Sequence, residues 1–361
     1  MTTSPNQRLW LGLSRVLYSP WLHPLNDADA WERLRVWMNP MWSRRDYPAR
    51  VLDIIDETPD TRSFVLKPTA RWPGHRAGQH VVVEVEINGR RVHRSFSLSS
   101  APTPDRRLRI TVKRQPGARV SGWLHEHVRI GDVLRLSAPT GRFAPAEGAA
   151  PLLLLSAGSG ITPLMAIVED LHRRGDPRAI VFIHCCRTPA DFIFADRLRV
   201  LAAEWPNFEL RVHYSASAGR FDVRQLSDLL HCQTLVCGPR ALTQNVEALF
   251  LAAGVKDQVR SESYSGRVLP HGDATQDSFG VHCSVTEQVF TARGDTSLLE
   301  AAEAAGLKPA HGCRIGICKT CQCTKRSGTA LNLRTGEISS EPNELIQLCI
   351  SVARSPLELA L

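Results

Sequence analysis

Four cysteines near the carboxyl terminus have the spacing needed to hold an inorganic cluster. Cys313, Cys318 and Cys321 stand at C-x4-C-x2-C spacing, and Cys349 follows downstream. A plant-type [2Fe–2S] cluster uses this ligand pattern, in which four thiolates hold two irons. Structural zinc sites more often show two C-x2-C pairs or a histidine pair. We therefore predict a [2Fe–2S] cluster at these cysteines, with a structural zinc site or a disulfide pair as the alternatives.

A second group of residues could bind a flavin. Arg94, Ser95, Phe96 and Ser97 read R-x-F-S, in which a guanidinium suits a phosphate and a planar ring suits another planar ring. This tetrapeptide resembles the flavin motif of the ferredoxin-NADP reductase family. The resemblance implies that Arg94 contacts the flavin phosphate, that Phe96 packs on the isoalloxazine and that Ser97 bonds near N5. The alternative for Phe96 is a core aromatic in a strand.

The segment from Gly117 to Leu124, GARVSGWL, resembles the G-x-x-S-x-x-L segment of the same family. In that family, backbone amides at the start of a helix hold the flavin pyrophosphate, because helix N-termini favour anions. The resemblance therefore assigns Gly117, Val120 and Ser121 to the flavin site. It implies FAD, and FMN is the alternative if nothing binds the adenosine half.

A glycine-containing turn further along could bind a nicotinamide dinucleotide. The segment AGSGITP follows an apolar strand and opens a helix, so Gly158 and Gly160 would let the backbone approach a phosphate. Thr162 is the natural hydroxyl donor in this segment. The turn resembles the nicotinamide-dinucleotide loop of the family and differs from the G-x-G-x-x-G fingerprint.

Two further segments complete the resemblance. Cys237, Gly238 and Pro239 match the C-G-P of the family, where the cysteine and glycine lie beside the nicotinamide; the alternative is a free buried cysteine. Glu262 and Tyr264 stand where family members carry an acid followed two residues later by an aromatic near the flavin. Serine replaces the commoner basic residue between them. The residues that the resemblance places at the reacting rings are Ser97, Cys237, Glu262 and Tyr264.

Preference for the nicotinamide cofactor depends on three polar residues. Arg187 ends the second strand of the nucleotide domain, where arginine suits a 2′-phosphate and an acid would suit a ribose hydroxyl. Ser215 and Arg220 resemble the other phosphate-facing positions of the family. Together they favour NADPH, and NADH remains the alternative because arginine at this place also occurs in NADH-dependent members.

The pattern of apolar runs predicts several domains. Short β-type runs with turns between them indicate an antiparallel β-barrel over residues 46–148. Alternating strands and helices indicate a doubly wound α/β nucleotide domain over 149–268. A turn-rich linker, 269–278, leads to an α+β ferredoxin (β-grasp) domain at 279–361, and residues 1–45 form a helical N-terminal extension.

The N-terminal extension is rich in tryptophan. Trp31, Leu34, Trp37 and Met38 recur at helical spacing after the possible caps Asn26 and Asp27, so we expect an amphipathic helix. These aromatics could pack back onto the main body, or they could dock a membrane or a membrane-bound partner. The basic stretch before Asp27 leaves a transit peptide as a further alternative.

Composition narrows the classes of protein. The 361 residues are 43% hydrophobic and 22% charged with a net charge of +8, as in an ordinary globular chain with a basic balance. An acidic partner or an anionic membrane surface would suit that charge, whereas the scattered Lys and Arg residues argue against nucleic acid. Ten cysteines without a signal peptide favour the cytoplasm. Five of them are expected to be bystanders: Cys185, Cys186, Cys232, Cys283 and Cys323.

The order of domains resembles the reductases of oxygenases and desaturases. It implies transfer of electrons from NADPH or NADH through FAD and the [2Fe–2S] cluster to a terminal acceptor. From the chain as a whole, we expect the terminal acceptor to be a membrane fatty-acyl desaturase or hydroxylase. The reductase would then make peripheral contact with the inner membrane face. The alternatives are a soluble ring-hydroxylating or diiron oxygenase, a self-contained oxidase or monooxygenase and, in a different class, a flavin and iron–sulfur redox sensor.

Overall fold

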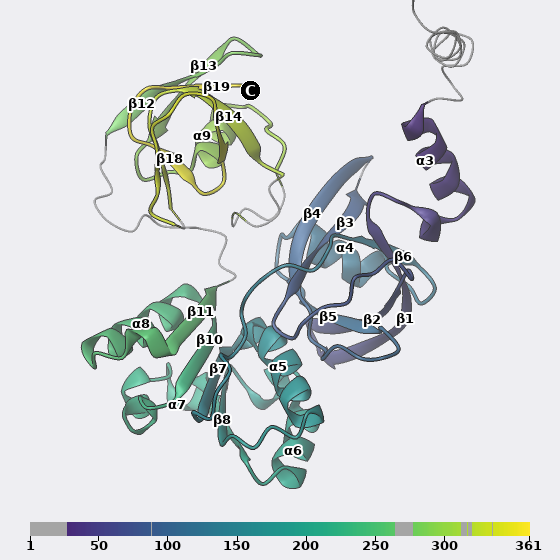
Figure 1. The fold of residues 1–361 in the computed structure, drawn as a ribbon, viewed down its shortest axis with the longest axis vertical. Coiled ribbons are helices and arrows are strands. Elements are labelled where there is room, and N and C mark those ends of the chain that lie inside the picture. The colour runs from purple at the N-terminus through teal and green to yellow at the C-terminus, as the bar shows by residue number, and fades with distance from the viewer. Residues whose placement is uncertain (1–26, 88, 264–276, 312–315, 317–319, 334) are drawn as a thin grey trace, which may run out of the picture.

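The structure is a computed structural model that describes residues 27–87, 89–263, 277–311, 316, 320–333 and 335–361. Figure 1 shows three β-rich domains in chain order, with a helix at the amino-terminal side of the first. Tyr264, Cys313 and Cys318 lie outside the described residues, as do most of the predicted linker and the first 26 positions. The predicted multidomain fold, with a barrel, an α/β domain and a C-terminal α+β domain, is confirmed.

The first domain is an antiparallel sheet that curls into a barrel. Its strands are β1 (Tyr47–Thr58), β2 (Thr61–Pro68), β3 (His80–Ile87), β4 (Arg90–Ser97), β5 (Leu108–Lys113) and β6 (Val133–Leu136), in the order β4-β3-β6-β1-β2-β5. A bridge from Leu98 to Ile110 joins the end of β4 to β5 and so closes the barrel. Inward residues such as Phe64, Val83 and Ile110 are fully buried. Helix α4 (Arg119–His127) lies between β5 and β6 in sequence and contacts β4.

The second domain has a parallel sheet with the strand order β11-β10-β7-β8-β9. Its strands are β7 (Leu152–Ala157), β8 (Ile180–Cys186), β9 (Phe208–Tyr214), β10 (Gln233–Gly238) and β11 (Val259–Ser263). The run LLLL in β7 is completely buried, as expected where helices cover both faces of a parallel sheet. Its helical segments are η2 (Gly158–Gly160), α5 (Ile161–Arg173), η3 (Pro189–Asp191), α6 (Ala195–Glu204), α7 (Ser215–Ala218), η4 (Val223–Leu229), α8 (Arg240–Ala252) and η5 (Lys256–Gln258).

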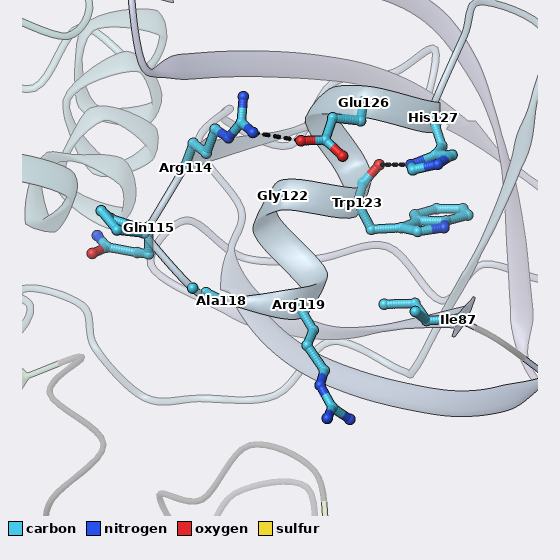
Figure 2. Close-up of a pocket in the computed structure, with 11 residues that line it drawn as sticks. Ile87, Arg114, Gln115, Ala118, Arg119, Gly122, Trp123, Glu126 and His127 are labelled. Atoms are coloured by element: carbon cyan, nitrogen blue, oxygen red, sulfur yellow. Dashed lines mark hydrogen bonds and ion pairs between the residues drawn. The ribbon is translucent and has the colours of Figure 1, made fainter.

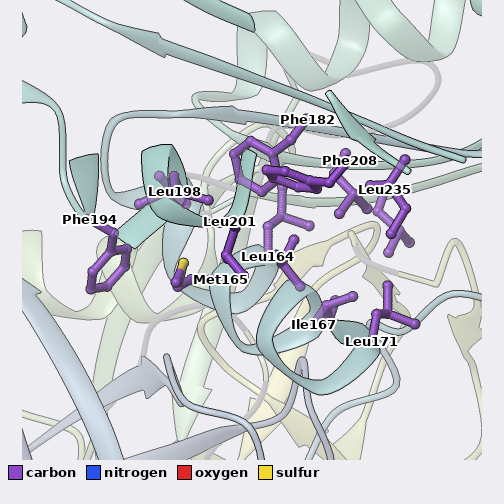
Figure 3. Close-up of a cluster of buried hydrophobic side chains, with 14 of the residues drawn as sticks. Leu164, Met165, Ile167, Leu171, Phe182, Phe194, Leu198, Leu201, Phe208 and Leu235 are labelled. Carbon is purple, nitrogen blue, oxygen red and sulfur yellow. The ribbon is translucent and has the colours of Figure 1, made fainter. Parts of the chain in front are cut away.

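Two apolar clusters hold that sheet between its helices. Figure 3 shows the cluster on one face, where Leu164 and Met165 of α5 meet Phe182 and Leu198. Val236 and Phe250 belong to the cluster on the opposite face. Because both faces are covered, the carboxyl ends of the strands remain as the place for a ligand.

The third domain has a five-stranded sheet of order β13-β12-β19-β14-β17 and a small sheet of order β16-β15-β18. Its elements are β12 (Ser278–Cys283), β13 (Gln288–Arg293), α9 (Leu298–Ala304), β14 (Gln322–Ser327), β15 (Ala330–Asn332), β16 (Ile338–Ser339), β17 (Glu344–Gln347), β18 (Ser351–Ala353) and β19 (Leu357–Leu359). Ser297 caps α9 by accepting a hydrogen bond from the Glu300 amide at 3.2 Å. Leu298 and Leu299 of α9 pack into the core of this domain.

The N-terminal helix α3 (Ala28–Met38), followed by η1 (Pro40–Trp42), confirms the predicted helix but has an unexpected orientation. Its acidic residue Glu32 is buried and accepts hydrogen bonds from the Ser43 hydroxyl at 2.8 Å and the Arg44 amide at 2.7 Å. The apolar face points outward, with Trp37 82% exposed and Met38 60% exposed. Of the described helices, none combines the length and apolarity that a membrane crossing requires.

Candidate functional site

The proposed flavin tetrapeptide lies at the end of β4. Phe96 is paired with Val81 and Ser97 with His80 across the β3–β4 ladder. Ser97 is 5% exposed, whereas Arg94, Ser95 and Phe96 are half-buried. The alternating register therefore gives Phe96 the opposite face of β4 from Ser97, and Phe96 packs partly against the barrel core.

Helix α4 offers an anion site beside that strand. Gly117 has φ +72° and precedes a helix whose N-cap, Ala118, provides no side-chain acceptor, so the first amides are available to a ligand. A Cβ added to Gly117 would meet open space. The Ser121 hydroxyl accepts a hydrogen bond from the Gln115 amide at 3.2 Å and fixes the turn into α4, and Val120 is buried.

A pocket of about 710 Å³ opens over the start of α4 (Figure 2). Its lining includes Ile87 at the end of β3 and, from α4, Arg119, Trp123 and His127. The Trp123 and His127 rings are stacked, with centroids 5.4 Å apart and an interplanar angle of 12°. Sequence reasoning missed these residues, although their spacing of four on a helix was a signal that two rings share one face.

The pocket has the chemistry that FAD requires. A phosphate would find free amides and a guanidinium at the start of α4, and an aromatic base would find an indole face. Arg114, also in the lining, is occupied by an ion pair with Glu126. The residues present therefore fit a flavin with an adenosine half.

The proposed nucleotide loop lies at the carboxyl end of β7. Gly158 has φ +54° and open space where a Cβ would stand. A Cβ on Gly160 would lie 2.1 Å from the Cys237 carbonyl oxygen, so this glycine lets the loop pack against the C-G-P segment. Thr162 is buried and its hydroxyl donates to the Ser159 carbonyl at 3.0 Å, which tightens the loop.

The C-G-P segment and the acidic residue lie side by side. In the parallel ladder of β10 and β11, Cys237 is paired with Glu262, and Gly238 with Ser263. Cys237 is fully buried, and Pro239 follows as the N-cap of α8. These residues share the strand-end edge with Gly160, as a nicotinamide site would require. Tyr264 lies outside the described residues.

The residues proposed for the 2′-phosphate gather after β8 and β9. The Ala216 amide, next to Ser215, donates to the Arg187 carbonyl at 3.0 Å. The Arg187 side chain is 76% exposed and lies 3.6 Å from the Asp191 carboxylate. Hydrogen bonding from the Thr188 hydroxyl, with help from Arg187, lowers the pKa of Asp191.

Arg220 follows α7 and is exposed. Within the described part of the chain, no ion pair holds its guanidinium, in contrast to Arg187 and to Arg224, which pairs with Asp222 at 2.6 Å. Sequence reasoning missed Asp191, whose negative charge offsets part of the attraction of Arg187 for a phosphate.

The described half of the proposed cluster site is assembled. Cys321 and Cys349 are both buried, and the Leu348 amide donates to the Cys321 carbonyl at 3.1 Å. Gly316 has φ +75°, and a Cβ there would come within 2.5 Å of the Ile350 side chain. The arrangement brings together the segments that carry Cys321 and Cys349, which fits iron–sulfur ligation. The other two proposed ligands, Cys313 and Cys318, lie outside the described residues.

The five cysteines expected to be bystanders are buried or half-buried. Burial raises the pKa of Cys185 to about 12 and that of Cys186 to about 11. Burial also raises the pKa of Cys232 and of Cys283. Cys323 lies in the core of the third domain, on β14. Such thiols stay protonated and behave as small apolar side chains.

Three family models match the chain in succession. The oxidoreductase FAD-binding domain matches residues 48–144, the oxidoreductase NAD-binding domain residues 154–248, and the 2Fe-2S iron-sulfur cluster binding domain residues 281–354. These matches support FAD, a nicotinamide cofactor and a [2Fe–2S] cluster as the cofactors.

Individual relatives align over most of this chain and most of their own length. The NADPH oxidoreductase of Mycobacterium tuberculosis is 34% identical over 325 residues, covering 87% of this chain and 84% of its own. The ferredoxin reductase component of the 3-ketosteroid-9-alpha-monooxygenase of Mycolicibacterium smegmatis is 30% identical over 82% of this chain and 89% of its own. The structure of phthalate dioxygenase reductase, a modular structure for electron transfer from pyridine nucleotides to [2Fe-2S], aligns with a TM-score of 0.61 at 25% identity, covering 87% of this chain and 98% of that one.

Proposed function

Because the chain belongs to the ferredoxin-NADP reductase family of flavoproteins, in the branch with a C-terminal [2Fe–2S] domain, we propose that it is the reductase component of a terminal oxygenase. The observation that carries the proposal is the presence of all three domains together with relatives that are reductase components of oxygenases. The barrel, with its pocket over α4, would hold FAD, which would supply the change from two-electron transfer at the nicotinamide to one-electron transfer at the cluster. The protein's task is to bind and orient these groups.

The residues of the chain have separate tasks in this proposal. Arg94 and Arg119 offset the phosphate charge of the flavin, while Phe96 packs against its ring system. Gly160 and Cys237 would hold the nicotinamide at the strand ends, and Glu262 would lie beside it, because Glu262 is paired with Cys237 in the ladder. Because no protein nucleophile is required, the rate depends on the relative placement of the rings.

The pocket over α4 supports FAD rather than FMN. FMN ends at its phosphate, so it would leave the faces of Trp123 and Ile87 without an occupant. We expect apoprotein to bind FAD at least about tenfold more tightly than FMN, and Trp123→Ala to lose most of that difference, because base–aromatic stacking contributes about 1–3 kcal/mol. Equal affinity of wild-type apoprotein for both flavins would contradict the assignment.

The arginines after β8 and β9 support NADPH as the electron donor. Arg220 is exposed without an ion pair among the described residues, so it can meet a 2′-phosphate without losing another partner. Arg187 must share its charge with Asp191 at 3.6 Å. We therefore assign Arg220 the larger part of the preference and Arg187 the smaller, with Ser215 as a hydroxyl donor.

The direct test of the proposed function is reconstitution. Purified holoprotein, NADPH and a purified candidate oxygenase are mixed, and consumption of NADPH is compared with formation of hydroxylated product. Coupled turnover that requires all three components would support the proposal. Failure of both NADPH and NADH to bleach the flavin and the cluster under anaerobic conditions would contradict it, whatever oxygenase is used.

A membrane-bound acceptor, such as a fatty-acyl desaturase or hydroxylase, is a second candidate favoured by α3. This helix is anchored through Glu32 and turns Trp31, Leu34 and Trp37 outward, beside the exposed Arg33. Aromatic and arginine side chains on one exposed face suit an interfacial location on an anionic bilayer.

Sedimentation with vesicles tests this candidate. Wild type should sediment with vesicles of phosphatidylcholine and phosphatidylglycerol, and Trp37→Ser should not, whereas both should reduce cytochrome c equally. Ile130→Ser, which removes another exposed apolar side chain from the barrel, is the matched control. If the wild type does not bind vesicles, docking to the acceptor through a bilayer surface is contradicted.

A further inference from the structure

One arginine of the flavin barrel has a side chain that spans the boundary to the nucleotide domain. Arg109, on β5 of the barrel, lies 3.2 Å from Glu169 on α5 of the nucleotide domain. Its guanidinium also donates to the Ser99 carbonyl at 2.5 Å and to the Ser99 hydroxyl at 3.2 Å. The Arg109 and Glu169 side chains are only 17% and 19% exposed, so the pair is largely shielded from water.

The nucleotide domain supplies two further contacts to this arrangement. The ring of Phe194 lies under the Arg109 guanidinium, with 4.7 Å between the guanidinium carbon and the ring centroid. Phe194 is buried and has φ +60°, a left-handed conformation that is unfavourable for a bulky residue. The second Glu169 oxygen accepts a hydrogen bond from the Ala101 amide at 3.4 Å. Glu169 therefore contacts the barrel through both carboxylate oxygens.

These contacts connect the two segments that carry the cofactor motifs. Ser99 stands two residues after Ser97, the last residue of the flavin tetrapeptide on β4. Glu169 stands on the helix that starts directly after the loop residue Gly160. A shift of α5 relative to β5 would therefore move the nucleotide loop relative to the flavin strand.

The energetics favour a role in geometry over a role in stability. In a shielded ion pair, the attraction between the two charges is offset by the free energy lost when both are removed from water. The presence of such a pair is therefore weak support for a contribution to stability. Its strict geometry, with one guanidinium fixed by a carbonyl, a carboxylate and a ring, does restrict orientation. Reactions between two bound rings are sensitive to displacements of about 1 Å.

We propose that Arg109, Glu169 and Phe194 form an interdomain latch that sets the position of the nicotinamide relative to the flavin. Arg109 and Glu169 are positioning residues in this account, because they act through β4 and α5. The latch rests on the proposed function, since it requires that the nucleotide loop and the flavin strand each hold their cofactor.

Anaerobic stopped-flow reduction of the FAD-loaded, full-length protein tests the latch. Arg109→Met and Glu169→Gln should each slow the limiting rate of flavin bleaching by NADPH at least about tenfold, while the apparent Kd for NADPH changes by less than about threefold. The long-wavelength absorbance that arises when flavin and nicotinamide stack should weaken in parallel. FAD content and the cluster spectrum should remain those of the wild type.

The matched control is Arg173→Met, which removes an ion pair to Asp170 on the same helix but does not cross the boundary. It should retain the wild-type rate. The double variant should be about as slow as the slower single variant, because the two residues act as one unit. If the rate of the double variant is reduced by the product of the two single reductions, Arg109 and Glu169 act independently. That result would contradict their role as one unit.

The outcomes separate the latch from the proposed function. If Arg109→Met does not fold, Glu169→Gln decides, since it keeps the shape of the side chain and an acceptor for Ala101. Wild-type bleaching rates and stacking absorbance in Glu169→Gln would overturn the latch. Failure of the wild type itself to accept electrons from NADPH or NADH would instead overturn the proposed function.

Discussion

The two helices proposed to receive phosphates, α4 in the barrel and α5 in the nucleotide domain, begin in similar ways but in different surroundings. Each follows a glycine-containing turn with positive φ, at Gly117 and Gly158, and neither N-cap side chain occupies the first amides. The start of α4 carries the exposed Arg119 and opens into a pocket. The first turn of α5, from Ile161 to Leu164, is buried throughout.

This difference suits the two ligands assigned to the helices. A flavin that must stay bound through many turnovers would gain from the Arg119 guanidinium and from the aromatic face of Trp123. A nicotinamide cofactor that must leave after each turnover would meet backbone amides at α5, and its charged contacts would lie farther away at Arg220. We therefore expect binding of the nicotinamide cofactor at α5 to depend mainly on close packing, and binding of the flavin at α4 to depend mainly on charge.

The largest expected effect is steric and concerns Gly160. In Gly160→Ala the new methyl group would lie 2.1 Å from the Cys237 carbonyl oxygen, so the loop or the C-G-P segment must shift. We expect kcat/KM for NADPH to fall about 100-fold with FAD content unchanged. In Gly117→Ala the methyl group meets open space, and only the strain of φ +72° remains, about 1 kcal/mol. Equal activity of the two variants would contradict the contrast in packing.

Charge at α4 is tested by Arg119→Met. Loss of the guanidinium should raise the dissociation constant of FAD about tenfold, because charge-assisted hydrogen bonds contribute about 1.5–3 kcal/mol. Titration of apoprotein with FAD, followed by flavin fluorescence, measures the change. Arg129→Met, which alters an exposed arginine just beyond the same helix, is the control. FAD affinity unchanged in Arg119→Met would show that the amides of α4 suffice.

Charge at the nucleotide site is tested by Arg220→Met. The KM for NADPH should rise about fivefold to tenfold, because its 2′-phosphate loses the Arg220 guanidinium as a partner. The KM for NADH should stay nearly constant, because NADH has no 2′-phosphate. Arg224→Met is the matched control, because Arg224 is already engaged by Asp222 at 2.6 Å. Comparable kcat/KM for the two nucleotides in the wild type would rule out the preference itself.

The smallest expected effect concerns a buried histidine beneath the α5 site. His184 bonds the Ser156 hydroxyl through Nδ1 at 2.8 Å, and its buried Nε2 has no partner among the described residues. Burial lowers the pKa of His184 to about 3. Because the unfolded chain takes up this proton near pH 6.5, the free energy of unfolding should fall by up to about 1.4 kcal/mol per pH unit below that value, down to about pH 3.

His184→Gln should flatten that dependence. Urea unfolding of both proteins at pH 7.5 and 5.5 measures it, and between these two pH values the free energy of unfolding should fall about 1.3 kcal/mol further for the wild type than for His184→Gln. Parallel pH profiles for wild type and His184→Gln would show that this histidine is not the group responsible.

The sequence predicted the classes of domain because local patterns determine them. Alternating β-branched runs indicated the antiparallel strands, and the buried run LLLL indicated a parallel one. The strand order of the barrel could not be predicted, because β3 and β6 pair across a long stretch of chain. The contact from Arg109 to Glu169, 60 residues apart, is likewise a product of the fold.

Sequence reasoning could propose site residues where a motif is contiguous, and it missed neighbours that only the fold brings together. R-x-F-S, AGSGITP and C-G-P were readable as short segments. Asp191 beside Arg187 and the Trp123–His127 stack required the structure. The orientation of α3 was also unpredictable, since periodicity shows that Trp31, Leu34 and Met38 share a face but not whether that face points inward or outward.

The most direct test of the central claim is anaerobic stopped-flow reduction of Cys321→Ser by NADPH, with Cys323→Ser as the matched control. Cys321 contacts the segment carrying Cys349, whereas Cys323 lies in the ladder opposite Ile346. We predict that Cys321→Ser loses the cluster absorbance and cytochrome c reduction while its flavin bleaches at the wild-type rate, and that Cys323→Ser behaves as wild type. Slow flavin bleaching in Cys321→Ser, or full cytochrome c reduction without the cluster, would contradict an electron path from NADPH through FAD to [2Fe–2S].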